Sequence, residues 1–268
     1  MLNTSIVVYN HIIQDIEPLI RALKNSEYVK HIYIIDNSPN RTPAFEKLTA
    51  DYIFTNNNLG YGAAHNIALK KSIESNTSYH LVVNPDIRFE PEILTTIVQF
   101  MNNNSEIGQL MPKIVYPTGE IQYLCKLLPT PFDLIFRRFL PLSWTKKRIE
   151  QFEMRASGYN KIMDVPYLSG CFMFLRTKAL NEVGLFDEQF FMYPEDIDLT
   201  RRMHKKYRTV FYPEATVIHH HAQDSYKSMK MMGVHISNMI KYFNKWGWFF
   251  DKERKKVNRE VLKQLSGK

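Results

Sequence analysis

Three carboxylates within four residues are the first place in this sequence where chemistry could occur. Glu195, Asp196 and Asp198 follow a bulky apolar run in the stretch FFMYPEDIDLTRR (190–202). Their position behind Pro194 is equally typical of an ordinary helix start, because proline and acidic side chains both favour the positive end of a helix. This stretch alone therefore leaves a catalytic carboxylate and a well-charged first turn as alternatives.

Asp86 and a run of three histidines offer ligands for a divalent cation. Asp86 ends the strand-like stretch YHLVVNPD, and the histidines end the strand-like stretch TVFYPEATVIHHH. A carboxylate beside a ligand diphosphate is what Mg²⁺ or Mn²⁺ takes from a protein. An alternating strand points His219 and His221 to one side and His220 to the other, so one of the first pair could complete a metal site. Surface or hydrogen-bonded histidines are the commoner interpretation.

The elements that must position these residues alternate between strand and helix. The pattern predicts strands at 5–9, 31–36, 52–55 and 79–84, with helices near 16–23, 66–75 and 91–103. Such alternation indicates an α/β fold with a mostly parallel sheet covered on both faces. Four prolines interrupt the pattern between 116 and 162, and a final helix has Ile236, Met239, Ile240 and Phe243 at core spacing.

Polar residues follow each of the first four predicted strands. They are Tyr9-Asn10, Asp36-Asn37, Asn56-Asn57-Asn58 and Asn84-Pro85-Asp86. Each group alone is an ordinary turn, but ligands gather at the carboxyl ends of parallel strands, so four groups in register predict a functional cleft. Gly60 and Gly62 then open a helix, where a ligand phosphate could approach the backbone, although a tight turn explains them equally well.

Bulk composition is that of a soluble globular protein. The chain has 268 residues, 44% hydrophobic and 23% charged, which is enough for one large or two small domains. Two cysteines make neither a disulfide framework nor a metal cluster, which favours a reducing cytosol. No stretch is typical of a signal peptide or a membrane span, so we expect a soluble or peripheral protein.

The net charge of +8 is concentrated in two segments. Residues 137–148 hold five basic side chains and no acid, and residues 251–268 hold seven basic and three acidic ones. Aromatic residues accompany both segments, including Trp144, Trp246, Trp248, Phe249 and Phe250. Cations beside aromatic rings predict contact with an anionic membrane surface. A nucleic-acid surface and a merely solvated basic face are the alternatives.

The order of these motifs resembles the family-2 glycosyltransferases, and within them the rhamnosyltransferase-like branch that builds bacterial surface polysaccharides. The resemblance covers about residues 3–245 and rests on SIVVYN, IIDN, NNLGYGAAHN, VVNPD, LSGCFMFLR, GLFDEQFFMYPEDIDLTRR and YPEATVIHH. It implies a GT-A fold, with a Rossmann-like, mostly parallel central sheet flanked by helices and a C-terminal helical extension. The implied domain is 1–222, with a nucleotide-sugar half (1–115) and an acceptor and catalytic half (116–222), followed by a basic and aromatic extension (223–268).

The resemblance also implies an activity. It is inverting, metal-assisted transfer of rhamnose or a hexose from a dTDP- or UDP-linked donor, with Mg²⁺ or Mn²⁺, to a hydroxyl of a growing, lipid-linked glycan. The implied location is the cytoplasmic, inner face of a bacterial membrane. In such a reaction a base takes the acceptor proton while a metal stabilises the departing diphosphate.

Site residues carry over by position. Asp36 would contact the base or ribose of the donor, and Asn58, Gly60 and Asn66 would shape its pocket, with Tyr9 and Asn10 at the first strand end. Asp86 and His219 would hold the metal, beside Asn84, where many relatives have a second carboxylate. Gly170 would line the sugar and acceptor side. Asp196 would be the base and Glu195 a positioning group. Asp198, about 200° around the helix from Asp196, would be structural.

Two other functions remain as alternatives. A sugar-1-phosphate nucleotidyltransferase shares the general architecture but needs a glycine-rich basic loop after the first strand, and SIVVYNHIIQDIEP has none. A basic nucleic-acid-binding protein without enzymatic activity would need a recognised motif, and the excess charge lies outside the predicted cleft. We therefore expect no nucleic-acid partner.

Overall fold

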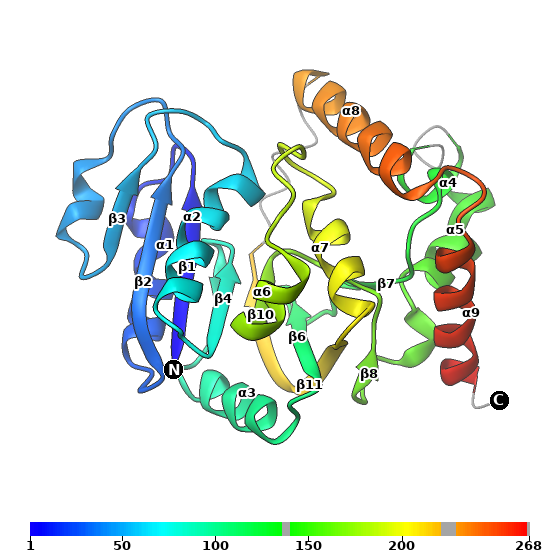
Figure 1. Ribbon diagram of the computed structural model, residues 1–268, viewed down its shortest axis with the longest axis horizontal. Coiled ribbons are helices and arrows are strands. Elements are labelled where there is room, and N and C mark those ends of the chain that lie inside the picture. The colour runs from blue at the N-terminus through cyan, green and yellow to red at the C-terminus, as the bar shows by residue number, and fades with distance from the viewer. Residues whose placement is uncertain (136–139, 221–228, 267–268) are drawn as a thin grey trace.

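A nine-stranded mixed sheet forms the centre of the structure, a computed structural model that describes residues 1–135, 140–220 and 229–266 (Figure 1). The strands follow the order β3-β2-β1-β4-β10-β6-β11-β5, and β8 pairs with β11. They are β1 (Leu2–Val8), β2 (Val29–Asp36), β3 (Asp51–Phe54), β4 (Tyr79–Val83), β5 (Ile87–Arg88), β6 (Ile107–Val115), β8 (Met163–Asp164), β10 (Phe172–Arg176) and β11 (Arg208–His219). Two short strands, β7 (Cys125–Lys126) and β9 (Tyr167–Leu168), pair separately.

One antiparallel strand brings two distant segments to the same edge of the sheet. Strands β1 to β4 are mutually parallel, and β6 is parallel to β11, as predicted for most of the sheet. Strand β10 runs antiparallel between β4 and β6. Its amino end therefore meets the carboxyl end of β4, where the backbone N–H of Asn84 donates to the carbonyl of Cys171 at 2.9 Å.

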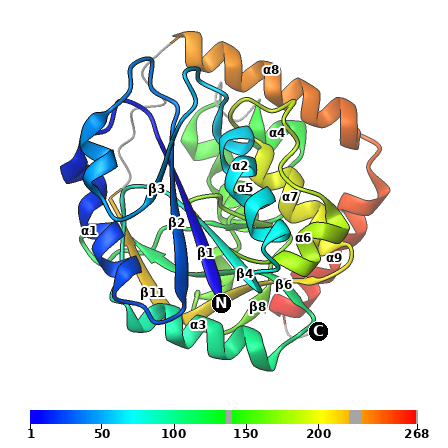
Figure 2. The same ribbon diagram turned by 60° about the vertical axis from the view of Figure 1, so that its left-hand side comes forward.

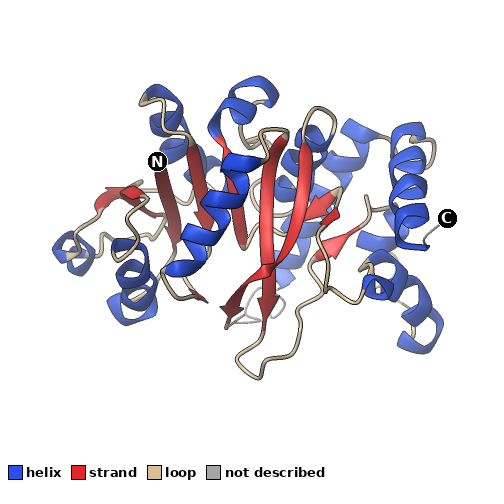
Figure 3. Cartoon of the chain, turned by 90° about the horizontal axis from the view of Figure 1, so that it is seen from below, coloured by secondary structure: helices blue, strands red, loops and turns tan. Residues whose placement is uncertain are grey.

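Helices cover both faces of the sheet, as predicted (Figures 2 and 3). Helices α1 (Ile13–Lys24) and α3 (Glu92–Asn103) pack on one face. Helices α2 (Tyr61–Glu74), α6 (Thr177–Val183) and α7 (Glu195–His204) pack on the other. Side chains of β4 alternate between the two faces. Leu81 and Val83 pack in the same core cluster as α1 and α3, and Val82 packs in the same cluster as α2, α6 and α7. Two short 3₁₀ turns, η1 (Pro43–Lys47) and η3 (Arg155–Ser157), also occur among the described residues.

The sequence analysis assigned no strand to β6, although it is central in the sheet. Pro112 interrupts its pattern, and proline cannot donate a hydrogen bond to a neighbouring strand. The structure places Pro112 opposite Tyr212, where the register of β11 shifts before Thr216. The irregular pairing accommodates the missing donor.

The C-terminal region folds back onto the sheet domain. Helices α4 (Pro131–Leu134), α5 (Leu142–Phe152), α8 (Met229–Trp246) and α9 (Lys252–Ser266) lie together at one side of the molecule (Figure 1). Met239 and Phe243 of α8 are buried as predicted, but Ile240 is 41% exposed, so its assignment to the core was wrong. Within the described residues, no helix combines the length and apolarity needed to cross a bilayer. The division into 1–222 and 223–268 stays a prediction, although Val261 of α9 belongs to the main core.

Candidate active site

The loops after the first three strands are joined to one another by hydrogen bonds. The backbone N–H of Asn10 donates to Ser38 Oγ at 2.8 Å, and Asn37 Nδ2 donates to the carbonyl of Gly60 at 3.0 Å. Thr55 Oγ1 donates to the carbonyl of Asp36 at 2.8 Å. The polar strand ends therefore form one connected edge, and the exposed Tyr9 lies at its start.

Two of the predicted donor-binding residues are buried and already bonded within the protein. Both carboxylate oxygens of Asp36 accept hydrogen bonds, from the Ser38 N–H at 2.9 Å and from the Tyr52 hydroxyl at 2.7 Å. Asn66 binds Phe186 through both ends of its amide. Both side chains are therefore held in place by contacts within the protein. Their roles as donor ligands remain predictions.

Gly60 is required by a close approach of the chain rather than by a ligand. It has a φ of +85°, and a Cβ atom there would lie 2.1 Å from the carbonyl oxygen of Phe191. The N–H of Tyr61 donates to that same oxygen at 2.9 Å, and Asn58 Oδ1 accepts from the Gly60 N–H at 3.0 Å. The loop before α2 is thereby fixed against the segment that leads into α7.

Asp86 and His219 face each other at the end of β11. His219 Nε2 lies 3.3 Å from Asp86 Oδ1, and the Asp86 side chain is 29% exposed, whereas that of His219 is 6% exposed. Gln122 fixes the ring. Its Oε1 accepts from His219 Nδ1 at 2.8 Å, while its Nε2 donates to the His219 carbonyl at 2.8 Å. Because Nδ1 must then carry the proton, a neutral His219 directs the lone pair of Nε2 toward Asp86.

The carboxylate oxygen of Asp86 and Nε2 of His219 are suitable ligands for a divalent cation. A carboxylate oxygen and an imidazole lone pair directed at one another repel unless a proton or a cation lies between them. The bond from Gln122 to the far ring nitrogen is the outer-shell contact that metal-binding histidines usually have. No group of three or more His, Cys, Asp or Glu side chains suited to a metal occurs among the described residues. The protein would thus supply two ligands, leaving the others to a diphosphate and water.

Tyr61 lies between this pair and the carboxylates of α7. Its hydroxyl is 3.1 Å from Asn84 Oδ1 and 2.8 Å from the carbonyl oxygen of Gly170. Burial raises the pKa of the Tyr61 phenol well above its usual range, and the charges of surrounding acidic groups, including Glu195, Asp196 and Asp86, add to the shift. A single phenol therefore lies within electrostatic reach of both predicted functional pairs.

Asp196 is held by two backbone N–H groups. Its Oδ2 accepts from Gly170 at 3.0 Å, and its Oδ1 accepts from Ile197 at 2.8 Å. A Cβ atom at Gly170 would lie 3.2 Å from the Asp196 Cβ, so the glycine leaves room for this carboxylate. Helix α7 begins directly after Pro194, as expected, and its first turn carries the acidic residues.

The adjacent carboxyl group of Glu195 has a different environment. It is 4% exposed, and its Oε2 has no hydrogen-bond partner among the described residues. Burial raises the pKa of Glu195 well above its usual range, and the charge of Asp196 raises it further. Burial also raises the pKa of Asp196, but the Gly170 N–H and the positive charge of Lys126 oppose that shift. The contacts that oppose the shift at Asp196 have no counterpart of that strength at Glu195, so Asp196 is the candidate proton acceptor of the pair.

Asp198 makes the structural contacts expected of it. Its side chain is fully buried, with Oδ2 2.8 Å from Arg202 Nε and Oδ1 2.7 Å from Lys245 Nζ. The indole N–H of Trp246 also donates to Oδ1 at 2.8 Å. Asp198 therefore fixes α8 to α7 and does not face Asp196.

Three residues near the site were missed by the sequence analysis: Tyr61, Gln122 and Lys126. Tyr61 directly follows Gly60 at a helix start, which is a usable signal. Gln122 and Lys126 lie in the irregular stretch after 116, where no periodicity marks them. His221, Arg137 and Arg138, which entered the metal and membrane predictions, lie outside the described residues.

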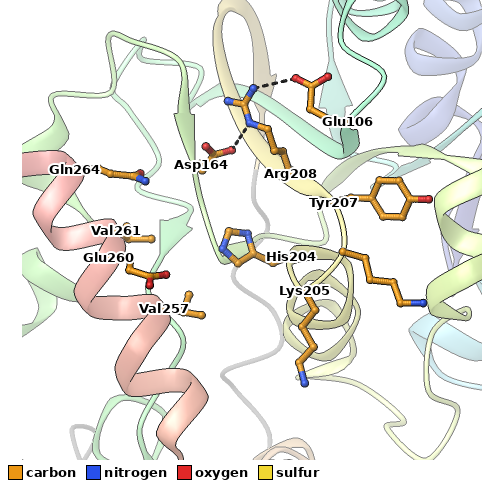
Figure 4. A pocket seen from close by; sticks show the side chains of 11 residues that line it. Glu106, Asp164, His204, Lys205, Tyr207, Arg208, Val257, Glu260, Val261 and Gln264 are labelled. Atoms are coloured by element: carbon orange, nitrogen blue, oxygen red, sulfur yellow. Dashed lines mark hydrogen bonds and ion pairs between the residues drawn. The ribbon is translucent and has the colours of Figure 1, made fainter.

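A separate cavity of about 440 Å³ lies at the opposite end of α7, against α9 (Figure 4). Arg208 lines it, but the guanidinium group is paired with Asp164 at 2.9 Å and with Glu106 at 3.1 Å. This cavity contains none of the predicted site residues, and we assign it no ligand.

Comparison with known proteins finds similarity to glycosyltransferases. The model of a protein family described as Glycosyltransferase like family 2 matches residues 45–235. N-acetylglucosaminyl-diphospho-decaprenol L-rhamnosyltransferase of Mycobacterium tuberculosis (strain CDC 1551 / Oshkosh) is 29% identical over 189 residues, which are 64% of this chain and 59% of that protein. Rhamnosyltransferase WbbL of Escherichia coli (strain K12) is 27% identical over 191 residues, 68% of this chain and 69% of WbbL. The chain thus spans less than two thirds of the mycobacterial relative.

Solved structures give the same fold. The mannosyltransferase PcManGT from Pyrobaculum calidifontis, in complex with GDP-Man and Mn²⁺, has a TM-score of 0.58 and 13% identity. The match covers 99% of this chain and 75% of that one. Identity at this level shows a shared architecture only. The predicted GT-A fold is confirmed.

Proposed function

Because the chain belongs to glycosyltransferase family 2, we propose that it transfers a sugar from a nucleotide-diphosphate donor to a hydroxyl group of a glycan, by single displacement with inversion. The observation that carries the proposal is the position of Tyr61, which contacts Asn84 of the Asp86 motif on one side and Gly170, the partner of Asp196, on the other. A candidate metal-ligand pair and a candidate base are therefore linked through one tyrosine.

Asp196 would act as the general base. As the acceptor oxygen attacks the anomeric carbon, its proton passes to the Asp196 carboxylate, the bond to the donor diphosphate breaks, and the nucleoside diphosphate leaves. Gly170 and Ile197 hold the carboxylate in place through their N–H groups. Burial raises the pKa of Glu195, which favours the protonated form that could position the acceptor by donating a hydrogen bond.

Asp86 and His219 would hold Mg²⁺ or Mn²⁺ together with the donor diphosphate. When bound, the cation supplies the positive charge that stabilises the leaving group. With only one protein carboxylate, and with Asn84 engaged by Tyr61, affinity for the free metal is expected to be modest until the diphosphate completes the coordination.

The names of two relatives support a choice of substrates. The name of the mycobacterial relative specifies rhamnosyl transfer onto a sugar carried by a diphospho-lipid, and WbbL is also named as a rhamnosyltransferase. We therefore propose rhamnose or a hexose as the transferred sugar, dTDP or UDP as its carrier, and a lipid-linked saccharide as the acceptor. Work on such an acceptor would place the chain at the cytoplasmic face of the cell membrane, where the thiols of Cys125 and Cys171 stay reduced.

The two alternatives have less support. No relative reported above is named as a nucleotidyltransferase or a nucleic-acid-binding protein, and family membership favours sugar transfer over both.

Calorimetric titration with dTDP, UDP, GDP and ADP, each with and without Mn²⁺ or Mg²⁺, tests the donor site first. We expect one nucleotide to bind tightly only when metal is present. Asp86→Ala should remove that metal dependence and weaken the metal-assisted binding by more than about 100-fold, since loss even of an outer-shell partner typically costs about 10–100-fold. Equal binding by both proteins would exclude Asp86 as a ligand.

A further inference from the structure

Two adjacent phenylalanines project from the turn between α8 and α9. Phe250 is 92% exposed and Phe249 is 63% exposed, and Phe250 is the most exposed large apolar side chain among the described residues. Single exposed apolar residues are ordinary, but two neighbouring aromatic rings in water are a typical sign of an interaction surface.

The turn that carries these rings is firmly held. Arg254 is buried, and its guanidinium group donates to the carbonyl oxygens of Gly247 at 3.3 Å, Trp248 at 2.8 Å and Pro129 at 3.2 Å. The Trp248 ring packs against Phe243, with 5.3 Å between ring centroids. The two phenylalanines are therefore presented by an ordered part of the fold.

Helix α9 continues this surface with a stripe of cations. Its exposed basic residues fall within about 100° of the helix circumference, because an α-helix advances by about 100° per residue. The opposite side, with Arg254, Val257 and Val261, packs inward. One exposed acid, Glu260, flanks the stripe, 4.0 Å from Lys256. The stripe consists of Lys252, Lys255, Lys256, Arg259 and Lys263.

The aromatic and cationic parts adjoin. A hollow of about 350 Å³ between α9 and the start of α4 is lined by Phe249, Trp248, Lys255 and Arg259 together. Helix α9 lies at the outer edge of the molecule (Figures 1 and 3), and its five cations are exposed. We call Phe249, Phe250 and the five cations the α9 face.

We propose that the α9 face binds an anionic lipid bilayer, with α9 lying along the headgroups and the two phenylalanines inserted beneath them. Five cations complement anionic headgroups, and the projecting rings complement the apolar layer below. Single-stranded nucleic acid would favour rings interleaved with the cations, so that bases stack between phosphate contacts. Here both rings lie at one end of the stripe.

Both basic segments entered the membrane prediction, and the structure favours the second, 251–268, which contains the five cations of the α9 face. Of the segment 137–148, Arg148 is engaged by Asp133 at 2.8 Å and lies over the Phe132 ring, with 4.4 Å to the ring centroid. Trp144 is 78% exposed and can add to the contact. A lipid-binding face would bring the protein to the lipid-linked acceptor of the proposed function, and its biological purpose rests on that function. Vesicle binding itself requires neither the sugar donor nor the acceptor.

Sedimentation with vesicles tests the α9 face. Vesicles of phosphatidylglycerol and phosphatidylcholine are compared with phosphatidylcholine alone, at low and high salt. We expect binding to the anionic vesicles only, weakened by salt as screened charges require. A charge variant, Lys252→Gln/Lys255→Gln/Arg259→Gln/Lys263→Gln, should lose at least about tenfold in partition, and Phe249→Ser/Phe250→Ser about tenfold.

A matched control removes the same charge elsewhere. Lys24→Gln/Lys30→Gln/Lys47→Gln/Lys71→Gln changes four exposed lysines in the first third of the chain and should bind within about twofold of the unmodified protein. If this control loses as much as the α9 variant, or if the α9 variant loses nothing, the proposal is wrong. Tight binding of single-stranded RNA that depends on the stripe, without vesicle binding, would assign the face to nucleic acid instead.

Turnover of a soluble acceptor fragment separates this proposal from the proposed function. The α9 variants should retain that turnover. Vesicle binding without sugar transfer from any nucleotide sugar would reject the proposed function and leave the lipid surface in place.

Discussion

The Asp86–His219 pair and the Glu195–Asp196 pair lie on either side of Tyr61, but the protein treats them in opposite ways. Asp86 is partly exposed, and its partner His219 is oriented by Gln122. Glu195 and Asp196 are buried side by side, and one oxygen of Glu195 has no partner among the described residues. The first pair directs two candidate ligand atoms at one another, 3.3 Å apart. The second keeps water away, which raises both pKa values.

The difference shows that carboxylates of one type can acquire separate roles through their surroundings alone. A partly exposed carboxylate and an imidazole ring held in one tautomer are suited to binding a metal ion. Burial raises both pKa values in the second pair, and backbone N–H groups and Lys126 oppose that rise at Asp196, which suits Asp196 as the proton acceptor. The predictions below test that contrast, and the largest expected effect comes first.

Asp196→Asn should lower turnover by about 10²- to 10⁴-fold, which is the usual contribution of a general base. Donor binding measured by calorimetry should stay within about twofold, since the amide preserves the shape of the site. The matched control is Glu195→Gln. Because burial raises the pKa of Glu195 well above its usual range, its neutral amide should retain most of the turnover. If Glu195→Gln proves the more damaging of the two, the roles within the pair are reversed.

Gln122→Leu should weaken Mn²⁺ affinity in the presence of nucleotide by about 10–100-fold, because His219 loses the bond that fixes its ring. The acid limb of the pH–rate profile should not move, since Gln122 does not contact Asp196. Titration of Mn²⁺ at saturating nucleotide measures the first effect. An unchanged metal affinity would show that the tautomer is fixed by another contact.

Tyr61→Phe should lower turnover by up to about tenfold, the equivalent of one or two ordinary hydrogen bonds, with little change in thermal stability. The ring still fills its place between the two pairs, but Asn84 and Gly170 lose its hydroxyl. We expect kcat to fall more than KM for the donor rises. A variant with unchanged kcat would remove Tyr61 from the coupling of the two pairs.

Lys126→Met should have the smallest effect at neutral pH and a visible one in acid. The positive charge of Lys126 lowers the pKa of Asp196, so its removal raises that pKa. Turnover requires the carboxylate and increases as pH rises through this pKa. The acid limb should therefore move to higher pH, while the plateau stays near its original height. A limb that moves to lower pH, or not at all, would show that Lys126 does not act on Asp196.

Much of this arrangement follows from local sequence pattern. The strand ends, the helix that begins after Pro194, and the alternation that turns His219 toward Asp86 all depend on neighbours in the chain. Local rules set those features, and the structure places the residues at one edge of the sheet.

The remainder depends on contacts between distant segments. Gln122 reaches His219 across 97 positions of the chain. Pro112 conceals a central strand, and the glycine at 60 is explained by Phe191 rather than by a phosphate. Ile240 has the spacing of a core residue, yet the surface of α7 is already covered by its neighbours Met239 and Phe243. Such details depend on how helices and sheet pack against one another, and the periodicity of apolar residues in the sequence does not specify that packing.

Helix α7 also limits how this chain can vary. Every residue from Glu195 to Arg201 is buried, and Arg201 is held by Asp251 at 2.8 Å and stacks on Trp246 at 4.1 Å from the ring centroid. No turn of the helix is free to change without disturbing the base, the sheet or the C-terminal helices. New acceptor preferences, whether arising in nature or selected in a mutant library, should therefore come from substitutions in the neighbouring segments 123–126 and 186–193, while the helix itself stays nearly constant.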